Sequence, residues 1–404
     1  MITMIPNDPT FLERQECLLC SKKELISIWE LRNLPFTDTL GGYTKDFPSL
    51  DQGLMICNVC GMVQLSRIVS PAFLYSTENY SYHRVNGPKI WQEGLFFRDL
   101  VKEIMPFTKA KHKTVLEIGG SSDVFISNLI DLFESALVID PAPRISVESN
   151  MKVEFIQGFM EDEWIQIKER EINLVICRHV IEHISYPLDF LRTLFENVKE
   201  GTLLIFETPN FLSVLSQMRL DAVNHQHVSY FDPNTFRNLV ESAGGEVVKE
   251  IMIQGGSNGG VMIYVFQKSK NRMRKSEQVH PAPNILAQKF NKVLAKFEIS
   301  MAEIESKIDK LQGGFYGIGA GSLLPTFNYH LNGRISKSFG IIDDDESKHG
   351  KSYKNVDVVV IPPDSWKETD ASTCLVTSLE NRKVLFKRAQ SIGFLDIICP
   401  RPLD

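Results

Sequence analysis

The sequence predicts an α/β protein in which a small cysteine-rich module precedes two doubly wound units. Three observations support this fold class: two Cys-x-x-Cys pairs near the start, alternating strands and helices between residues 113 and 267, and renewed alternation after residue 314. Parallel strands are buried on both faces and therefore appear as short continuous apolar runs, which both alternating regions contain. We expect three units, at residues 1–70, 71–275 and 276–404.

The first unit contains four cysteines that are spaced as metal ligands. Each Cys-x-x-Cys pair can place two thiolates on one tight turn, and the thirty-six residues between the pairs leave room for a hairpin. Four thiolates leave no open coordination position, so we expect a structural rather than a catalytic zinc. Two disulfides or unused thiols are the alternative. The predicted ligands are Cys17, Cys20, Cys57 and Cys60.

Composition limits the class of protein and its partners. The 404 residues suggest two to three domains, and 43% hydrophobic with 23% charged residues is ordinary for a soluble globular protein. The net charge of −6 argues against a general nucleic-acid binder. No apolar run has transmembrane length, and the first residues lack a signal peptide. We therefore expect a cytoplasmic protein, whose reducing surroundings favour zinc over disulfides.

The second unit begins with a helix predicted over residues 86–111. Four apolar runs then predict parallel strands, at residues 114–118, 136–139, 174–177 and 202–206, and residues 260–266 predict a late strand. The basic run at 268–275 is aperiodic and indicates a linker, although a phosphate-binding patch is an alternative.

The third unit opens with a long amphipathic helix, whose apolar residues recur every three or four positions between Leu286 and Leu311. We expect this stripe to pack on its own sheet or on an adjacent domain, with a dimer coil as the less favoured alternative. Further apolar runs predict a second Rossmann-like sheet. They occur at residues 314–318, 339–342, 356–361, 374–376 and 395–399.

The first predicted strand of the second unit leads into a glycine turn. Gly119 and Gly120 allow a ligand to approach the backbone closely, but the third glycine of a dinucleotide site is absent and Glu117 precedes the turn. An acid there repels a pyrophosphate and can pair with the ammonium and sulfonium groups of S-adenosylmethionine. Asp140, twenty-three residues beyond Glu117, ends the next strand, where an acid can bind both ribose hydroxyls.

Further candidate residues follow the later strands. Phe159 and Met160 offer apolar side chains beside the adenine position, and Arg178 and His179 follow the fourth strand. Packing near the site is an alternative role for His179. This ordered pattern resembles class I S-adenosylmethionine methyltransferases, and the resemblance implies that these residues bind the methyl donor.

A second group of polar residues lies at His225, Gln226 and His227, just before a Ser-Tyr pair. Imidazole titrates near neutral pH, so histidines in such a domain fit acid/base chemistry. The cysteine module, the methyltransferase core, this His-x-His-x-Ser-Tyr segment and the C-terminal unit occur in this order in one family. The chain resembles, over nearly its whole length, the C-methyltransferases that act on nucleotide-linked keto sugars of the dTDP-keto-deoxysugar type.

The resemblance implies a mechanism and names its residues. His227 falls at the position of the family's base, which removes the proton beside a ketone, and Tyr80 matches a supporting phenol. Tyr80, His225 or backbone N–H groups would stabilise the enolate, whose carbon then attacks the sulfonium methyl. The C-terminal unit would hold the nucleotide-linked sugar. The chain departs from the family pattern at Gln226, where Glu is usual, and at Asn224, where Tyr is usual.

Two other functions remain open. Because Gln226 carries no charge with which to orient a base, an O- or N-methyltransferase acting on a nucleotide sugar or related metabolite is the first alternative. A nucleic-acid or protein-binding module with an inactive core is the second, and the acidic charge, Glu117 and Asp140 argue against it. The sequence leaves open the sugar, the nucleotide, the methylated position, and whether the chain is a monomer or a homodimer.

Overall fold

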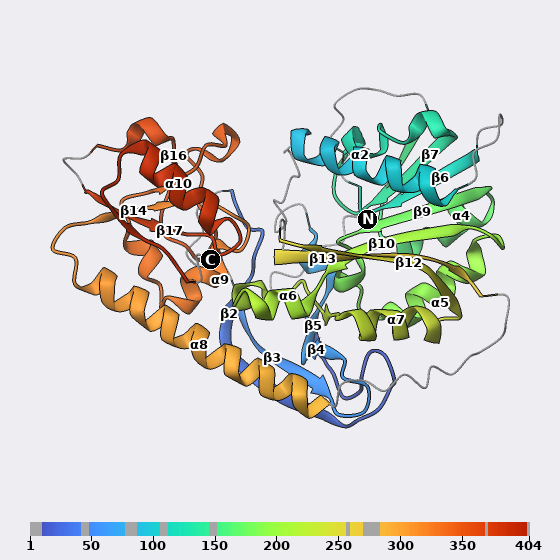
Figure 1. The fold of residues 1–404 in the computed structure, drawn as a ribbon, viewed down its shortest axis with the longest axis horizontal. Coiled ribbons are helices and arrows are strands. Elements are labelled where there is room, and N and C mark those ends of the chain that lie inside the picture. Colours follow the sequence, from blue (N-terminus) through green and yellow to red (C-terminus); the bar gives the residue numbers. More distant parts are fainter. Residues whose placement is uncertain are drawn as a thin grey trace.

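The structure is a computed structural model that describes residues 10–41, 48–76, 87–105, 112–120, 122–144, 152–255, 259–269, 283–367 and 371–401. These residues form a seven-stranded, a five-stranded and a four-stranded sheet, with a two-stranded ribbon. In Figure 1 the seven-stranded and five-stranded sheets form two lobes. The N-terminal strands and the long helix α8 run along the lower side and connect the lobes.

The seven-stranded sheet has the order β12-β13-β10-β9-β6-β7-β8, with strands β6 to β10 parallel and β13 antiparallel to β10. The four predicted parallel strands are confirmed, whereas the late strand proves to be antiparallel. The sequence analysis missed β8 and β12, which are the half-exposed edge strands and lack a continuous apolar run. The strands are β6 (His112–Ile118), β7 (Phe133–Asp140), β8 (Val153–Gln157), β9 (Ile172–Arg178), β10 (Leu203–Pro209), β12 (Gly245–Gln254) and β13 (Gly260–Lys268).

Helices connect these strands and cover the sheet. The first of them, α2, falls within the predicted helix and ends seven residues before its predicted limit, at Ile104. Asp232 caps α7 through a reciprocal pair of hydrogen bonds with Thr235, and Pro233 occupies the first turn, so the chain after the histidine segment is held firmly. The helices are α2 (Gly87–Ile104), α3 (Asp123–Ile126), α4 (Trp164–Lys168), α5 (Pro187–Asn197), α6 (Phe211–Ser216) and α7 (Pro233–Ser242).

The N-terminal sheet is antiparallel, in the order β11-β4-β3-β2. Its strand β11 comes from the histidine segment, where Ser229 and Tyr230 pair with Gln64 and Val63. This pairing ties the histidine segment to the cysteine module. The elements are β1 (Phe11–Glu13), which pairs with β5 (Arg67–Val69), then β2 (Leu25–Pro35), β3 (Ser49–Cys57), β4 (Val63–Leu65), β11 (Ser229–Tyr230) and the short helix α1 (Pro71–Leu74).

The C-terminal sheet is parallel throughout, in the order β16-β15-β14-β17-β18. The chain moves outward from β14 in one direction and then in the other, which is the doubly wound order expected from the sequence. Each strand lies within a predicted apolar run or overlaps it. The elements are β14 (Phe315–Ile318), α9 (Leu324–His330), β15 (Ile341–Ile342), β16 (Val360–Ile361), β17 (Thr373–Val376), α10 (Arg382–Ile392) and β18 (Asp396–Ile398).

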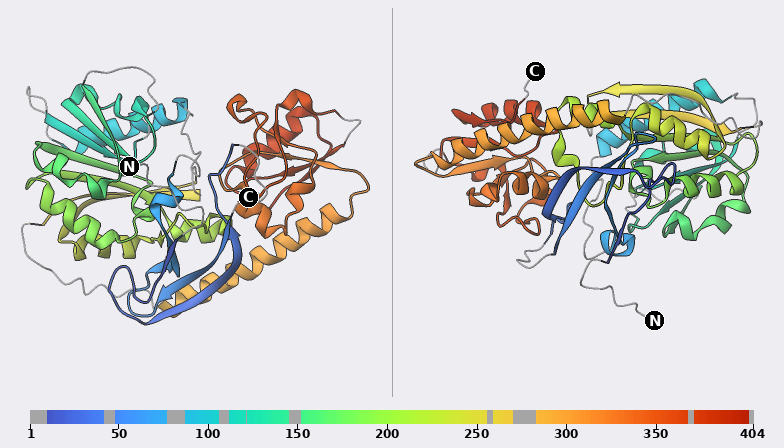
Figure 2. Two further views of the ribbon diagram at one scale, coloured as in Figure 1. Left: turned by 180° about the vertical axis from the view of Figure 1, so that it is seen from behind. Right: turned by 90° about the horizontal axis from the view of Figure 1, so that it is seen from below.

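Helix α8 (Pro283–Asp309) joins the lobes through its apolar face. Its buried stripe contacts β2, β3 and α6, so the predicted packing on an adjacent domain is confirmed (Figure 2). One hydrophobic cluster includes residues of the N-terminal sheet, α6, α8 and the C-terminal sheet. Burying apolar surface stabilises a structure by about 25 cal/mol per Å². The shared cluster therefore holds the three units against one another. The buried stripe consists of Leu286, Phe290, Phe297, Met301, Ile304 and Ile308.

Two sequence expectations concern the remaining chain. The predicted linker at 268–275 lies mostly outside the described residues. Within the described parts, every helix is too short or too polar to cross a bilayer.

Candidate active site

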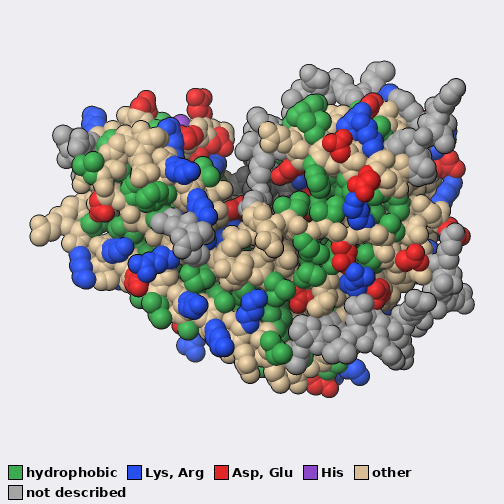
Figure 3. Space-filling view, viewed as in Figure 1, with side chains coloured by type: hydrophobic (Ala, Val, Ile, Leu, Met, Phe, Trp, Pro, Cys, Tyr) green, Lys and Arg blue, Asp and Glu red, His purple; other side chains and the backbone are tan. Residues whose placement is uncertain are grey.

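A cavity of about 200 Å³ lies where the three units meet, at the carboxyl ends of β6, β7 and β9. Ligands of open α/β sheets bind at this end of the strands. The surface is indented between the two lobes (Figure 3). The walls come from all three units and include Asp38, Tyr75, Gly119, Asp140, Phe159, Met160, His179, Glu182, His183, Asn224, Gln226, His227, Ser322 and Glu380.

The glycine turn after β6 forms one wall of the cavity. Gly119 has a φ of +81°, and a Cβ there would lie 2.2 Å from Val180 Cγ2, so both conformation and space require glycine. A Cβ at Gly120 would lie 2.5 Å from the Glu117 carboxyl carbon. Glu117 is buried behind the turn, and neither Glu117 nor Gly120 is among the residues that line the cavity.

Asp140 and the predicted apolar pair lie on the same side of the cavity. Asp140 ends β7, is 7% exposed, and accepts a hydrogen bond from the Ala142 backbone N–H across 2.7 Å through Oδ1. That bond positions the carboxylate at the cavity wall. Phe159 and the buried Met160 follow β8 and line the same wall. The structure thus brings Gly119, Asp140, Phe159 and Met160 together.

Arg178 does not line the cavity, in contrast to its predicted role. Its guanidinium forms ion pairs with Glu207, at 2.9 Å, and with Glu93, and lies over the rings of Phe97 and Phe125. Burial of an arginine requires such partners, because an unpaired charge in the interior is costly. Arg178 therefore stabilises the packing of α2 against the sheet.

His179 does line the cavity and is held by two carboxylates. Its Nδ1 lies 3.4 Å from Glu182 and its Nε2 lies 3.6 Å from Glu207. Burial alone would lower the pKa of His179, but the hydrogen bonds and charges of Glu182 and Glu207 raise it to about 9. His179 is therefore a cation at neutral pH, and its positive φ of 53° keeps the ring in this position.

The two histidines of the predicted catalytic segment have different surroundings. His225 is buried outside the cavity, where its Nε2 bonds the Leu34 carbonyl at 2.9 Å and its ring packs 4.3 Å from that of Phe36. Burial lowers the pKa of His225 to about 4. His225 therefore joins the segment to the N-terminal sheet, and its placement does not support the predicted contribution to the chemistry.

His227 lies in the cavity wall beside a third histidine. The rings of His227 and His183 are 4.9 Å apart, edge to face. Loss of solvation and the neighbouring His183 lower the pKa of His227 to about 3, so its imidazole is neutral at neutral pH. His183 Nδ1 lies 3.0 Å from the Gln226 carbonyl oxygen, which can only accept, so Nδ1 carries a proton and donates it in this bond.

Glu182 supplies the negative charge next to these rings. It is 2% exposed, and the Thr208 hydroxyl donates to its Oε2 across 3.1 Å. Burial alone would raise the pKa of Glu182, but His179, His183 and His227 lower it to about 2. An ionised carboxylate therefore lies among three imidazoles. Glu182, His183 and His227 each bring a possible metal-ligating atom within 4.8 Å of the others.

Two cavity residues from the N-terminal module escaped the sequence analysis. Tyr75 follows α1, and its ring lies 6.2 Å from that of His183. Burial and the nearby carboxylates, Asp38 first among them, raise the pKa of Tyr75 well above its usual value, so the phenol keeps its proton. Asp38 follows β2 and lies near Gln226. Tyr80, the predicted phenol, lies outside the described residues.

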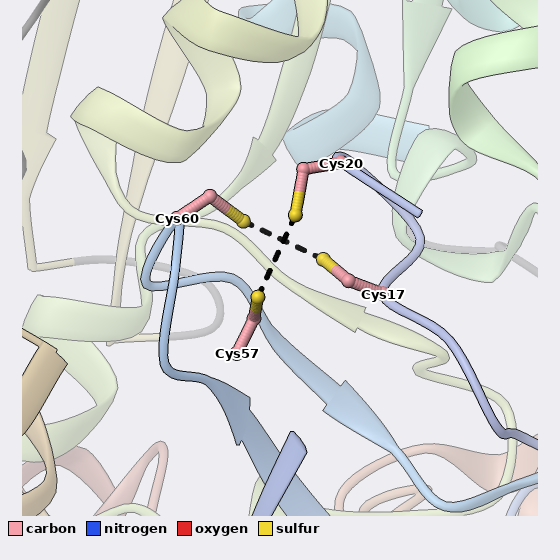
Figure 4. Close-up of side chains that lie close together, drawn as sticks. All are labelled: Cys17, Cys20, Cys57 and Cys60. Carbon is pink, nitrogen blue, oxygen red and sulfur yellow. Dashed lines mark hydrogen bonds between the residues drawn. The ribbon is translucent and has the colours of Figure 1, made fainter. Parts of the chain in front are cut away.

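The four predicted metal ligands form a cluster away from the cavity. Figure 4 shows the sulfurs of both Cys-x-x-Cys pairs pointing toward a common centre. Cys17 Sγ lies 3.4 Å from Cys60 Sγ, and Cys20 Sγ lies 3.6 Å from Cys57 Sγ. Zn–S bonds of about 2.3 Å in a tetrahedron separate the sulfurs by roughly 3.8 Å, whereas a disulfide needs about 2.05 Å. The geometry fits a tetrahedral zinc.

Comparison with known proteins bears on the central part of the chain. Residues 91–250 match a family described as a methyltransferase domain. C-methyltransferase NovU of Streptomyces niveus is 25% identical over 243 residues, which cover 58% of this chain and 56% of that protein. Ubiquinone biosynthesis O-methyltransferase of Hydrogenovibrio crunogenus is 23% identical over 163 residues, which cover 36% of this chain and 66% of that protein. The matches thus span less than two thirds of these relatives.

Among solved structures, N-methyltransferase NodS from Bradyrhizobium japonicum is similar to part of this chain. The match covers 46% of this chain and 99% of that chain, with 15% identity and a TM-score of 0.32. The family match at residues 91–250 covers strands β6 to β10 of the seven-stranded sheet.

Proposed function

We propose that this chain, which contains a class I S-adenosylmethionine-dependent methyltransferase domain, transfers a methyl group to the carbon beside a ketone of a nucleotide-linked keto sugar. The observation that carries the proposal is the position of His227. This neutral imidazole lies in the wall of the same cavity as Gly119 and Asp140, so the proposed base and the methyl donor would share one space.

The donor side of the cavity fits S-adenosylmethionine. Asp140 can accept hydrogen bonds from the ribose hydroxyls, Phe159 and Met160 can contact the adenine, and the turn at Gly119 admits the methionine moiety beside Glu117. When bound, S-adenosylmethionine supplies an electrophilic methyl on a sulfonium. The acidic residues of this wall suit a ligand that carries positive charge.

His227 would accept the proton of the acceptor carbon. A histidine acts as a base from its neutral form, which burial and His183 favour by lowering the pKa of His227. The same shift weakens the base, and the charge of Glu182 opposes it. The ionised Glu182 would stabilise the imidazolium once the proton has moved. His183 lies beside His227 on the same wall, and its Nδ1 is held 3.0 Å from the Gln226 carbonyl oxygen.

The enolate oxygen needs a hydrogen-bond donor. Tyr75 is a protonated phenol in the cavity wall, so it can supply such a bond without ionising. Tyr80, which matches the family's phenol, is the other candidate. The C-terminal unit would hold the nucleotide, with Ser322 and Leu323, from the loop after β14, meeting the sugar end of the acceptor.

The four cysteines would hold a structural zinc in this proposal. Four thiolates complete a tetrahedron, so the ion would stabilise the turns that carry them and take no part in methyl transfer. The turn of Cys17 and Cys20 precedes β2, and the turn of Cys57 and Cys60 joins β3 to β4, which pairs with the histidine segment through β11. The zinc would thereby support the position of His227 from a distance.

O-methylation is the second candidate, and two observations favour it. Gln226 replaces the Glu that is usual in the C-methyltransferase family, and ubiquinone biosynthesis O-methyltransferases are among the relatives. The two reactions differ in the atom that receives the methyl group, so the product separates them directly.

The test is incubation with methyl-¹³C-labelled S-adenosylmethionine and a nucleotide-linked 4-keto sugar, followed by carbon NMR of the product. Our proposal predicts a methyl group bonded to carbon. A methoxy signal would show O-methylation and contradict C-methylation. If the donor binds normally but no labelled sugar forms, this substrate class is excluded.

A further inference from the structure

We propose that Asp38 and Gln226 form a subsite that binds a hydroxyl group of the acceptor sugar next to the reacting carbon. The inference rests on the proposed function and adds to it a preference for acceptors that keep this hydroxyl. It is carried by the contacts that hold Asp38 at the junction of the three units.

Asp38 is fixed in place by its backbone. It follows β2 with a φ of 55°, a conformation that L-residues rarely adopt, and its N–H donates to the Ser322 carbonyl across 3.4 Å. Two residues later, Leu40 forms an antiparallel bridge with Tyr353. The loop from the N-terminal module is thus pinned to the C-terminal unit, and Asp38 lines the cavity from that edge.

The orientation of the Gln226 side-chain amide follows from its hydrogen bond with Thr37. The Thr37 hydroxyl donates to Gln226 Oε1 across 2.6 Å, so the side-chain NH₂ is the end of the amide that can reach Asp38. Asp38 is hydrogen-bonded by Ser322, Gln226 and Thr37. All three partners are neutral. The amide at position 226 therefore serves as a donor to a carboxylate, a role that the family's usual Glu could not fill while ionised.

Asp38 supplies a carboxylate beside the neutral amide of Gln226. Burial raises the pKa of Asp38 to about 6, and hydrogen bonds from Ser322, Gln226 and Thr37 oppose that rise. At neutral pH the side chain is mainly a carboxylate. A carboxylate has about four lone-pair sites, so it can accept a further hydrogen bond from a ligand in the cavity.

The chemistry of a keto sugar decides which group this is. Its ketone oxygen can only accept, whereas its hydroxyls are donors and match a carboxylate. The nucleotide's diphosphate would be repelled, because Asp38, Asp140, Glu161, Glu182 and Glu380 all line the cavity. The sugar ring, rather than the phosphates, therefore occupies this end of the site.

The test compares two probes on the protein loaded with S-adenosylhomocysteine. One is a nucleotide-linked 4-keto sugar that has a hydroxyl on the carbon next to the reacting carbon, and the other is the same sugar without that hydroxyl. Calorimetry of the wild type should show roughly tenfold or greater preference for the hydroxyl-bearing probe, since hydrogen bonds to charged groups discriminate by this order. Asp38→Asn should reduce the preference to within about twofold. Asp364→Asn, which changes an exposed carboxylate of the C-terminal unit, should retain it.

The outcomes separate this inference from the proposed function. If the wild type binds both probes equally, the hydroxyl subsite is wrong and the proposed function stands. If Asp38→Asn binds S-adenosylhomocysteine normally and keeps the wild-type preference, the subsite lies elsewhere. Binding of neither probe to a donor-loaded wild type overturns the substrate class and this inference with it.

Discussion

The Thr37 hydroxyl donates a hydrogen bond to Gln226 Oε1 across 2.6 Å, and this bond connects residues 189 positions apart. It joins the N-terminal module to the histidine segment at the edge of the cavity. The orientation of the amide, and with it the donor that faces Asp38, depends on this contact. Gln226 therefore has a structural partner in a different unit.

Gln226→Glu should destabilise the protein, because it places a second carboxylate beside Asp38. Like charges at this separation raise pKa values by one to two units, which corresponds to roughly 1–3 kcal/mol. The double variant Asp38→Asn/Gln226→Glu restores one carboxylate and one amide and should recover most of the loss. Urea unfolding at pH 8 measures both changes. Additive losses in the double variant would show that the two side chains do not interact.

His225 should contribute to acid sensitivity. Its folded-state pKa of about 4 lies below the usual 6.5, so the unfolded chain binds a proton there that the folded chain rejects. Stability from this residue is therefore fully present above pH 6.5 and is lost as the pH falls toward 4, by about 3 kcal/mol. His225→Gln should be less stable at pH 7 yet lose less stability on acidification. A variant whose unfolding free energy follows the wild-type pH profile would contradict this role.

The cysteine cluster should bind one zinc per chain. Cys57→Ser removes one of four thiolates and should abolish stoichiometric zinc and lower the melting temperature by several degrees, because metal binding is coupled to folding. Cys399→Ser changes a thiol outside the cluster and serves as the control. Elemental analysis and calorimetry give both readouts. Zinc-free wild type, freshly purified, or a Cys57→Ser protein that melts normally would rule out the structural zinc.

Asp140→Ala should weaken the binding of S-adenosylhomocysteine. The variant loses charge-assisted hydrogen bonds to the ribose, each worth roughly 1.5–3 kcal/mol. Because Asp140 Oδ1 also accepts from the Ala142 N–H, Asp140→Asn is the better-matched variant, since it keeps an acceptor for that bond. Both variants should lose affinity while Asp364→Asn does not. Unchanged calorimetric affinity in both would place the donor elsewhere.

The sequence predicted that Gly119 and Asp140 belong to one site, and the structure places both in the wall of the cavity. Gly119 and Asp140 lie where buried parallel strands end, and such strands appear as apolar runs. The edge strands β8 and β12 were missed for the opposite reason, since half-exposed strands lack these runs.

The acceptor side could not be predicted in the same way. Asp38 and Tyr75 reach the cavity through tertiary contacts, among them the bridge between Leu40 and Tyr353, and such contacts leave no periodic pattern in the sequence. His225 and His227 are equivalent as residue types in the sequence. Their roles separate only through their neighbours, the Leu34 carbonyl for one and His183 for the other.

The measurement that tests the central claim most directly follows the hydrogen on the acceptor carbon. A nucleotide-linked 4-keto sugar, deuterated at the carbon beside the ketone, is converted with the wild type and with His227→Asn, and the product is examined by mass spectrometry and NMR. Transfer to carbon requires loss of one deuterium, so we predict a wild-type product with one deuterium fewer and a carbon-bound methyl, and little product from His227→Asn despite normal donor binding. A methylated product that keeps all its deuterium would contradict C-methylation, and normal turnover by His227→Asn would contradict His227 as the base.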